Sequence, residues 1–136
     1  DDGETHSLHD FSGKKLILYF YPRDNTPGCT AEAIAFNKLA KEYAGEGCVI
    51  VGVSPDSAES HRNFKQKPNI GILLLADPDK ICATAYSAYG EKKNYGKTYM
   101  GIIRSTFIID VDGTVLKAFK NVKAKGHAEK VLCELR

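Results

Sequence analysis

Three short apolar runs, each followed by a segment with helical features, constrain the fold of this chain most strongly. The runs are KLILYFY at 15–21, CVIVGVS at 48–54 and GILLLAD at 71–77. Near-continuous apolar runs of this length are typical of strands that are covered on both faces of a parallel sheet. Because they alternate with helical segments, the sequence predicts an α/β fold, with a central sheet flanked by helices on both faces.

The helices are predicted from apolar periodicity and from start and stop signals. Apolar residues at positions 33, 36, 40 and 43 recur at steps of three and four, as on one face of a helix. Asp56, followed three residues later by Glu59, resembles a capping box. The expected helices are 27–43, 56–67, 78–90 and 125–136.

The chain after the third helix contains the strongest hairpin signal. Asp112-Gly113 separates two β-rich runs within residues 104–120, and this dipeptide favours a tight turn between antiparallel strands. The closing hairpin makes the predicted sheet mixed rather than wholly parallel. The tyrosine- and lysine-rich stretch YGEKKNYGKTYMG, residues 89–101, is interpreted as a solvated loop that borders the active site.

Length and charge restrict the class of protein. With 136 residues, 43% of them apolar, the chain is expected to form one domain over residues 1–136. Nineteen basic and seventeen acidic residues give a formal charge of +2, spread along the sequence, which predicts neither nucleic-acid nor membrane binding. The polar start, DDGETHSLHDFSGKK, contains no Met, so we expect the natural chain to begin further upstream.

The four cysteines lie far apart in the sequence. Their spacing contains no CxxC pair and none of the short intervals of a zinc site, so no metal is expected. A reduced, cytoplasmic protein is the simplest interpretation. Cys48 begins an apolar strand and is read as structural.

Cys29 occupies an unusual position, in the stretch YPRDNTPGCTAE. If a helix begins at Pro27, Thr26 is its N-cap and Cys29 lies in its first turn. Unpaired backbone N–H groups and the helix dipole then favour the thiolate, which is the reactive form of cysteine. A nucleophilic thiolate serves acyl transfer, disulfide exchange or peroxide reduction, and each reaction needs different neighbours.

Acyl transfer requires a histidine base and a group that orients it. The histidines lie in polar or terminal segments, and none is at a strand end that would obviously return to Cys29: His6, His9, His61 and His127.

Disulfide exchange of the thioredoxin kind requires a second cysteine separated by two residues, but Thr26 and Glu32 occupy those positions around Cys29. Peroxide reduction requires only a thiolate, hydrogen-bond donors and a positive charge that balances the developing negative charge on the leaving oxygen. This last requirement fits the chain best.

Pro22, Thr26 and Cys29 have the spacing P-x-x-x-T-x-x-C, which resembles the active-site signature of the peroxiredoxins. The longer stretch YFYPRDNTPGCTAEAIAF, together with VGVSPD, LLADPDK and YGKTYMGIIRSTFIID, is similar to the subgroup called peroxiredoxin Q or bacterioferritin comigratory protein. The resemblance covers nearly the whole chain. It implies a thioredoxin-like fold and a thiol-dependent peroxidase that acts on hydrogen peroxide and organic hydroperoxides, with no metal or bound organic cofactor.

The resemblance also implies roles for five residues. Cys29 would be the peroxidatic cysteine, Thr26 would donate a hydrogen bond to the peroxide, and Pro22 would shield the thiolate from water. Arg104 would stabilise the thiolate and polarise the O–O bond. Glu32, one helical turn beyond the cysteine, would orient Arg104.

The sequence departs from the subgroup at the resolving cysteine. Many members have one five residues after the first, where this chain has Ile34, and others have one in the next helix, where residues 64–67 contain none. We therefore expect a one-cysteine mechanism in which thioredoxin or a similar thiol acts directly, with Cys82 and Cys133 as candidates for unusual resolving residues. The protein is expected to be a monomer, with a dimer as the alternative. The competing function is a thioredoxin-like thiol-exchange or binding module without peroxidase activity.

Overall fold

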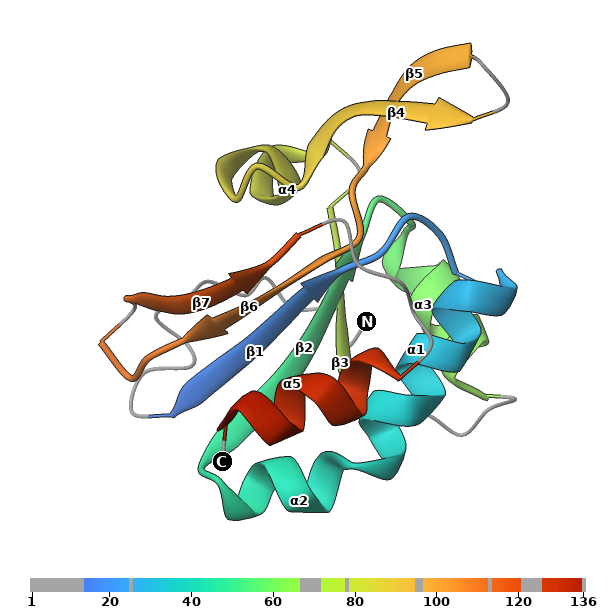
Figure 1. Ribbon diagram of the computed structural model, residues 1–136. Helices are drawn as coiled ribbons and strands as arrows, with labels where there is room; N and C mark the ends of the chain where they lie inside the picture. The colour runs from blue at the N-terminus through green and yellow to red at the C-terminus, as the bar shows by residue number, and fades with distance from the viewer. Residues whose placement is uncertain are drawn as a thin grey trace.

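The computed structural model describes residues 14–24, 26–66, 72–77, 79–94, 97–112, 114–120 and 126–135. Its central sheet has the strand order β3-β2-β1-β6-β7 (Figure 1). β1, β2 and β3 run parallel, whereas β6 and β7 pair antiparallel, so the predicted mixed sheet is confirmed. The strands are β1 Lys15–Phe20, β2 Cys48–Ser54, β3 Leu73–Ala76, β6 Ser105–Ile109 and β7 Val115–Phe119.

Helices cover both faces of this sheet, as the sequence predicts. The described helices are α1 Pro27–Lys38, α2 Ala40–Gly45, α3 Ala58–Gln66, α4 Ile81–Ala85 and α5 His127–Leu135. Side chains of β1 alternate between two apolar clusters, with Ile17 and Tyr19 in one and Leu18 and Phe20 in the other. The Tyr19 cluster receives residues from α1, α2, α3 and α5, and the Phe20 cluster receives Ala83 from α4. No helix in the described part of the chain is long and apolar enough to cross a membrane.

Gly52 allows the buried ring of Tyr19 to lie across the neighbouring strand. The two residues are register partners between β1 and β2. A Cβ atom at position 52 would lie 2.7 Å from Tyr19 Cζ and 2.8 Å from Leu74 Cδ2, closer than real Cβ contacts. Both neighbours are fully buried, so neither has free space into which it can move.

Substituting Gly52→Ala is therefore expected to destabilise the protein. Overpacking a dense core forces side chains from their preferred rotamers and costs about 1–3 kcal/mol of unfolding free energy. Urea denaturation of the two proteins measures the difference. Gly45→Ala is a matched control, because an added Cβ there meets nothing within 4 Å. Equal stability of Gly52→Ala and wild type would contradict the close packing of Tyr19 on β2.

The prediction of one continuous helix over 27–43 is wrong, because the chain forms two helices that meet at Leu39. Leu39 leaves helical geometry with φ −94° and ψ 5°. The break places Tyr43 of α2 so that its ring is buried and its hydroxyl donates a 2.6 Å hydrogen bond to the Ala128 carbonyl of α5. Periodicity does not report such contacts between helices, so it predicts no break here.

Two other helices begin later than predicted. α3 begins at Ala58, and the hydroxyl of Ser57, rather than the Asp56 carboxylate, accepts a hydrogen bond from the Ser60 N–H. α4 covers only Ile81–Ala85 instead of 78–90. It is bounded by Lys80 and Ser87, which both have left-handed backbone geometry with φ 58° and 59°. α5, in contrast, begins close to its predicted position.

The stretch 89–101 is not a loop, which corrects the interpretation made from the sequence. It forms most of a two-stranded antiparallel sheet of β4 Tyr89–Asn94 and β5 Lys97–Ile102, which extends away from the central sheet (Figure 1). The stretch is polar, but its two halves pair through an antiparallel backbone ladder from Tyr89 with Ile102 to Asn94 with Lys97. The hairpin predicted around Asp112 is confirmed by the pairing of β6 with β7. Its Gly113 lies outside the described residues.

Candidate active site

Cys29 lies at the start of α1, where the sequence predicts it. The helix begins at Pro27, with Thr26 in extended geometry at the N-cap, φ −86° and ψ 151°. The Thr30 N–H donates a 2.8 Å hydrogen bond to the Thr26 carbonyl, which closes the first turn around the cysteine. Because the side chain is buried at 2% exposure, Sγ is largely shielded from bulk water.

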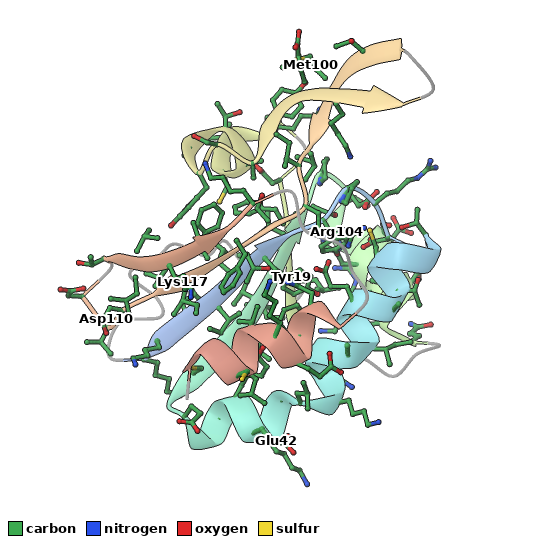
Figure 2. All side chains as sticks on the ribbon, viewed as in Figure 1. Tyr19, Glu42, Met100, Arg104, Asp110 and Lys117 are labelled. Atoms are coloured by element: carbon green, nitrogen blue, oxygen red, sulfur yellow. The ribbon has the colours of Figure 1, made fainter. Side chains whose placement is uncertain are left out.

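Arg104 joins Cys29 and Glu32 across a separation of 75 and 72 residues. It lies between β5 and β6, and Figure 2 shows it beside the N-terminal end of α1. Its Nη2 donates a 3.1 Å hydrogen bond to Cys29 Sγ, and its Nη1 donates a 2.5 Å bond to Glu32 Oε1. A Cβ atom at Gly28 would lie 3.3 Å from Nη2, so the guanidinium lies against the helix start. The three residues that the resemblance groups together are therefore in contact.

The charges of this group support one another. Burial alone would lower the pKa of Arg104, but Glu32 and Cys29 outweigh it and raise that pKa above its ordinary value, so the guanidinium stays cationic. Burial raises the pKa of Glu32 to about 7, and Arg104 opposes this rise. Within the described part of the chain, Glu32 Oε2 has no hydrogen-bond partner. The site thus presents a fixed positive charge to the sulfur atom.

Thr26 and Pro22 lie in the loop between β1 and α1. The Thr26 hydroxyl donates a 3.1 Å hydrogen bond to the Arg23 carbonyl and makes no cap bond to the helix. Donation to a peroxide would require this hydroxyl to rotate, because it has a single proton. Pro22 is half-buried. The roles of both residues toward a peroxide stay predictions.

The other cysteines differ from Cys29 in their surroundings. Cys82 packs with the apolar cluster on the opposite face of the sheet from Cys29, and burial, with Asp77, raises its pKa to about 11. Burial raises the pKa of Cys48, which lies at the start of β2. Cys133 is exposed on α5. All four thiols are free in this structure.

The histidines that the structure describes are engaged elsewhere. His61 Nδ1 lies 2.8 Å from Asp24, and Nε2 lies 3.0 Å from the Leu75 carbonyl. His127 Nε2 lies 2.7 Å from the Thr106 hydroxyl, and burial lowers its pKa to about 4. His6 and His9 lie outside the described residues. Neither described histidine is free to act as the base that acyl transfer requires.

Sequence reasoning missed two residues near the site. Asp24 is buried in the loop before Cys29, and its carboxylate contacts α3. Lys92 of β4 is half-buried, and its pKa is lowered by burial and by Arg104, whereas Cys29 raises it. Lys92 therefore lies within electrostatic range of the sulfur, and β4 borders the site. Both residues lie in stretches quoted above, YPRDNTPGCTAE and residues 89–101, but only the fold reveals their contacts.

The chain is similar to a known protein family and to curated proteins of several bacteria. Residues 1–118 match the AhpC/TSA family. A putative peroxiredoxin bcp of Helicobacter pylori is 53% identical over 131 residues, which cover 96% of this chain and 86% of the relative. Peroxiredoxin Bcp of Bacillus subtilis is 48% identical over 136 residues, covering 100% of this chain and 87% of the relative.

Solved structures of similar proteins have the same fold as this chain. A cysteine-to-serine mutant of Xanthomonas campestris peroxiredoxin Q superposes with a TM-score of 0.91 at 43% identity, covering 96% of this chain and 83% of the other. The bacterioferritin comigratory protein of the same organism, studied for its alkyl peroxide reduction activity, superposes with a TM-score of 0.90 at 42% identity and the same coverage. These relatives share the thioredoxin-like fold predicted from the sequence.

Proposed function

Because this chain belongs to the AhpC/TSA family, in which it is a thiol peroxidase of the peroxiredoxin Q and Bcp group, we propose that Cys29 reduces hydroperoxides through a sulfenic acid. The observation that carries the assignment is the 3.1 Å contact of Arg104 Nη2 with Cys29 Sγ at a helix N-terminus. A guanidinium in this position stabilises a thiolate and, later, the charge that develops on peroxide oxygens. Hydrogen peroxide and organic hydroperoxides are the proposed substrates.

The proposed chemistry is a two-electron oxidation of the sulfur atom. The Cys29 thiolate attacks the terminal peroxide oxygen, an S–O bond forms, and the O–O bond breaks. The departing oxygen takes up a proton and leaves as water or an alcohol, while Cys29 becomes a sulfenic acid. Glu32 holds Arg104 in place, Thr26 binds the peroxide through its hydroxyl, and Pro22 limits the entry of water.

For the return to the thiol, we propose a one-cysteine mechanism. Ile34 occupies one position where the subgroup has a resolving cysteine, and its side chain is 44% exposed. Cys82 packs on the far face of the sheet, so a disulfide with Cys29 would require a large rearrangement. An external thiol, from thioredoxin or a similar donor, attacks the sulfenic acid and releases water. A second thiol then reduces the mixed disulfide.

Trapping the oxidised cysteine tests this proposal. The reduced protein is treated with one equivalent of hydrogen peroxide, with and without dimedone, and the product is located by intact mass and peptide mapping. We expect one dimedone adduct, on Cys29. A disulfide from Cys29 to Cys82 or Cys133 would instead identify a resolving residue and contradict the one-cysteine step. Absence of rapid oxidation at Cys29 would favour the thiol-exchange module.

A further inference from the structure

A buried polar network ties the loop before Cys29 to three elements of the fold. It consists of Tyr21 and Asp24 from the loop, Ser54 at the end of β2, Asp56 just after that strand, Ser60 and His61 from α3, and the Leu75 carbonyl of β3. We refer to it as the Asp24 network. The proposed chemistry does not use it, although its central carboxylate precedes Cys29 by only five residues.

Asp24 is fully occupied in this network. Its Oδ1 accepts a 2.7 Å hydrogen bond from the Tyr21 hydroxyl, and its Oδ2 accepts one of 2.7 Å from the Ser60 hydroxyl and lies 2.8 Å from His61 Nδ1. Its backbone N–H donates a 2.7 Å bond to Asp56 Oδ2. Burial alone would raise the pKa of Asp24, but the bonds from His61, Tyr21 and Ser60 together hold that pKa below its ordinary value. The carboxylate is therefore ionised.

The partners of His61 engage both of its ring nitrogens. Nε2 lies 3.0 Å from the Leu75 carbonyl, which only accepts hydrogen bonds. Nδ1 lies 2.8 Å from Asp24 Oδ2, and an ionised carboxylate also only accepts. The Tyr21 hydroxyl, 3.3 Å from Nδ1, already donates to Asp24. With 0% exposure, His61 is thus a fully buried ring held between Asp24 and β3.

We propose that Asp24 and His61 are positioning residues of the peroxidase, which hold the loop so that Cys29 and Arg104 meet. This inference rests on the proposed function of Cys29. The loop is anchored at its start by the 3.0 Å bond from the Tyr21 N–H to the Val53 carbonyl. Asp24 supplies the next anchors, and α1 begins three residues later. Removing one partner leaves buried polar groups without their hydrogen bonds, which is costly, so the loop must move to relieve this cost.

Three variants separate positioning from simple loss of stability. His61→Leu and Asp24→Ala remove one side of the pair. Asp24→Asn keeps the shape of the side chain. Its amide can accept a hydrogen bond from Tyr21 and donate one to an unprotonated His61 Nδ1. Tyr43→Phe is the matched control, since it removes a buried hydrogen bond, to the Ala128 carbonyl, that lies outside the network.

Stopped-flow measurement of Cys29 oxidation by hydrogen peroxide gives the first readout. We expect the second-order rate constant to fall at least about 10-fold in His61→Leu and Asp24→Ala. We expect it to stay within about 3-fold of wild type in Asp24→Asn and Tyr43→Phe. Hydrogen exchange should become faster at the backbone amides of residues 23, 24, 26 and 28–30 in the first two variants only. Wild-type rates in both His61→Leu and Asp24→Ala would overturn the proposal.

The ¹⁵N shifts of the His61 ring give a second readout that needs no peroxide. In wild type we expect a proton on Nδ1, which faces the Asp24 carboxylate, and in Asp24→Asn we expect an unprotonated Nδ1. An unprotonated Nδ1 in wild type would overturn the pairing, and this result does not depend on whether His61→Leu folds. If wild type fails to react with peroxide, the proposed function fails, while ring shifts and hydrogen exchange still decide whether the pair orders the loop.

Discussion

Replacing Cys29 by serine is expected to abolish peroxide turnover. A serine hydroxyl is not ionised near neutral pH and is a far weaker nucleophile than a thiolate, even with Arg104 3.1 Å from the sulfur position. The fold should persist, because serine is close in size to cysteine and its hydroxyl accepts a hydrogen bond from the guanidinium. Peroxide consumption in the presence of excess dithiothreitol measures the loss.

The control for this variant is Cys48→Ser. Cys48 is also buried, but it lies at the start of β2 and its thiol contacts the Glu46 carbonyl at 3.7 Å. It should retain wild-type turnover, which shows that loss of any buried thiol is not sufficient. Peroxide consumption by Cys29→Ser at a rate near that of wild type would refute the assignment of the nucleophile.

Replacing Arg104 by alanine should slow the oxidation of Cys29 by about 10²–10³-fold, the usual effect of losing one donor to developing charge. The variant loses the contacts with both Cys29 and Glu32. Loss of the guanidinium should also raise the pKa of Glu32 further, because Arg104 is the group that lowers it. The protonated, neutral Glu32 then limits the penalty of leaving this buried side chain without its partner.

Two further substitutions separate the roles of charge and geometry. Arg104→Lys keeps a cation but loses the planar pair of donors that reaches Sγ and Oε1 together, so we expect an intermediate rate. Lys130→Ala removes an exposed cation on α5 and should leave the rate unchanged. Stopped-flow rates of Cys29 oxidation in the three variants show whether the charge of Arg104 or its geometry matters more. If Arg104→Ala and Lys130→Ala behaved alike, Arg104 would have no specific role.

Much of the fold can be predicted from the sequence because its signals are local. The apolar runs are buried strands at 15–20 and 48–54, and Thr26-Pro27 begins a helix within which Cys29 lies in the first turn. Each of these outcomes depends on residues within a few positions of one another. The Asp112-Gly113 turn between β6 and β7 is predicted for the same reason.

Other features depend on contacts that no local pattern contains. The break at Leu39 accompanies the burial of Tyr43 against α5, and the β4–β5 ribbon is held by backbone pairing in a polar stretch. Periodicity predicts one helix in the first case and a loop in the second, because it reports burial and not the partner that produces it.

The sequence by itself determined that a thiol lies at a helix N-terminus, and resemblance named its partners. Only the tertiary structure decided that Arg104 reaches Cys29 across 75 residues and that Asp24 pairs with His61 across 37. Both contacts form because β1, β2 and β6 are neighbours in one sheet, which brings the loop after β1 beside the residue before β6 and the helix after β2. Strand order, and not sequence spacing, sets which polar groups meet where water is excluded.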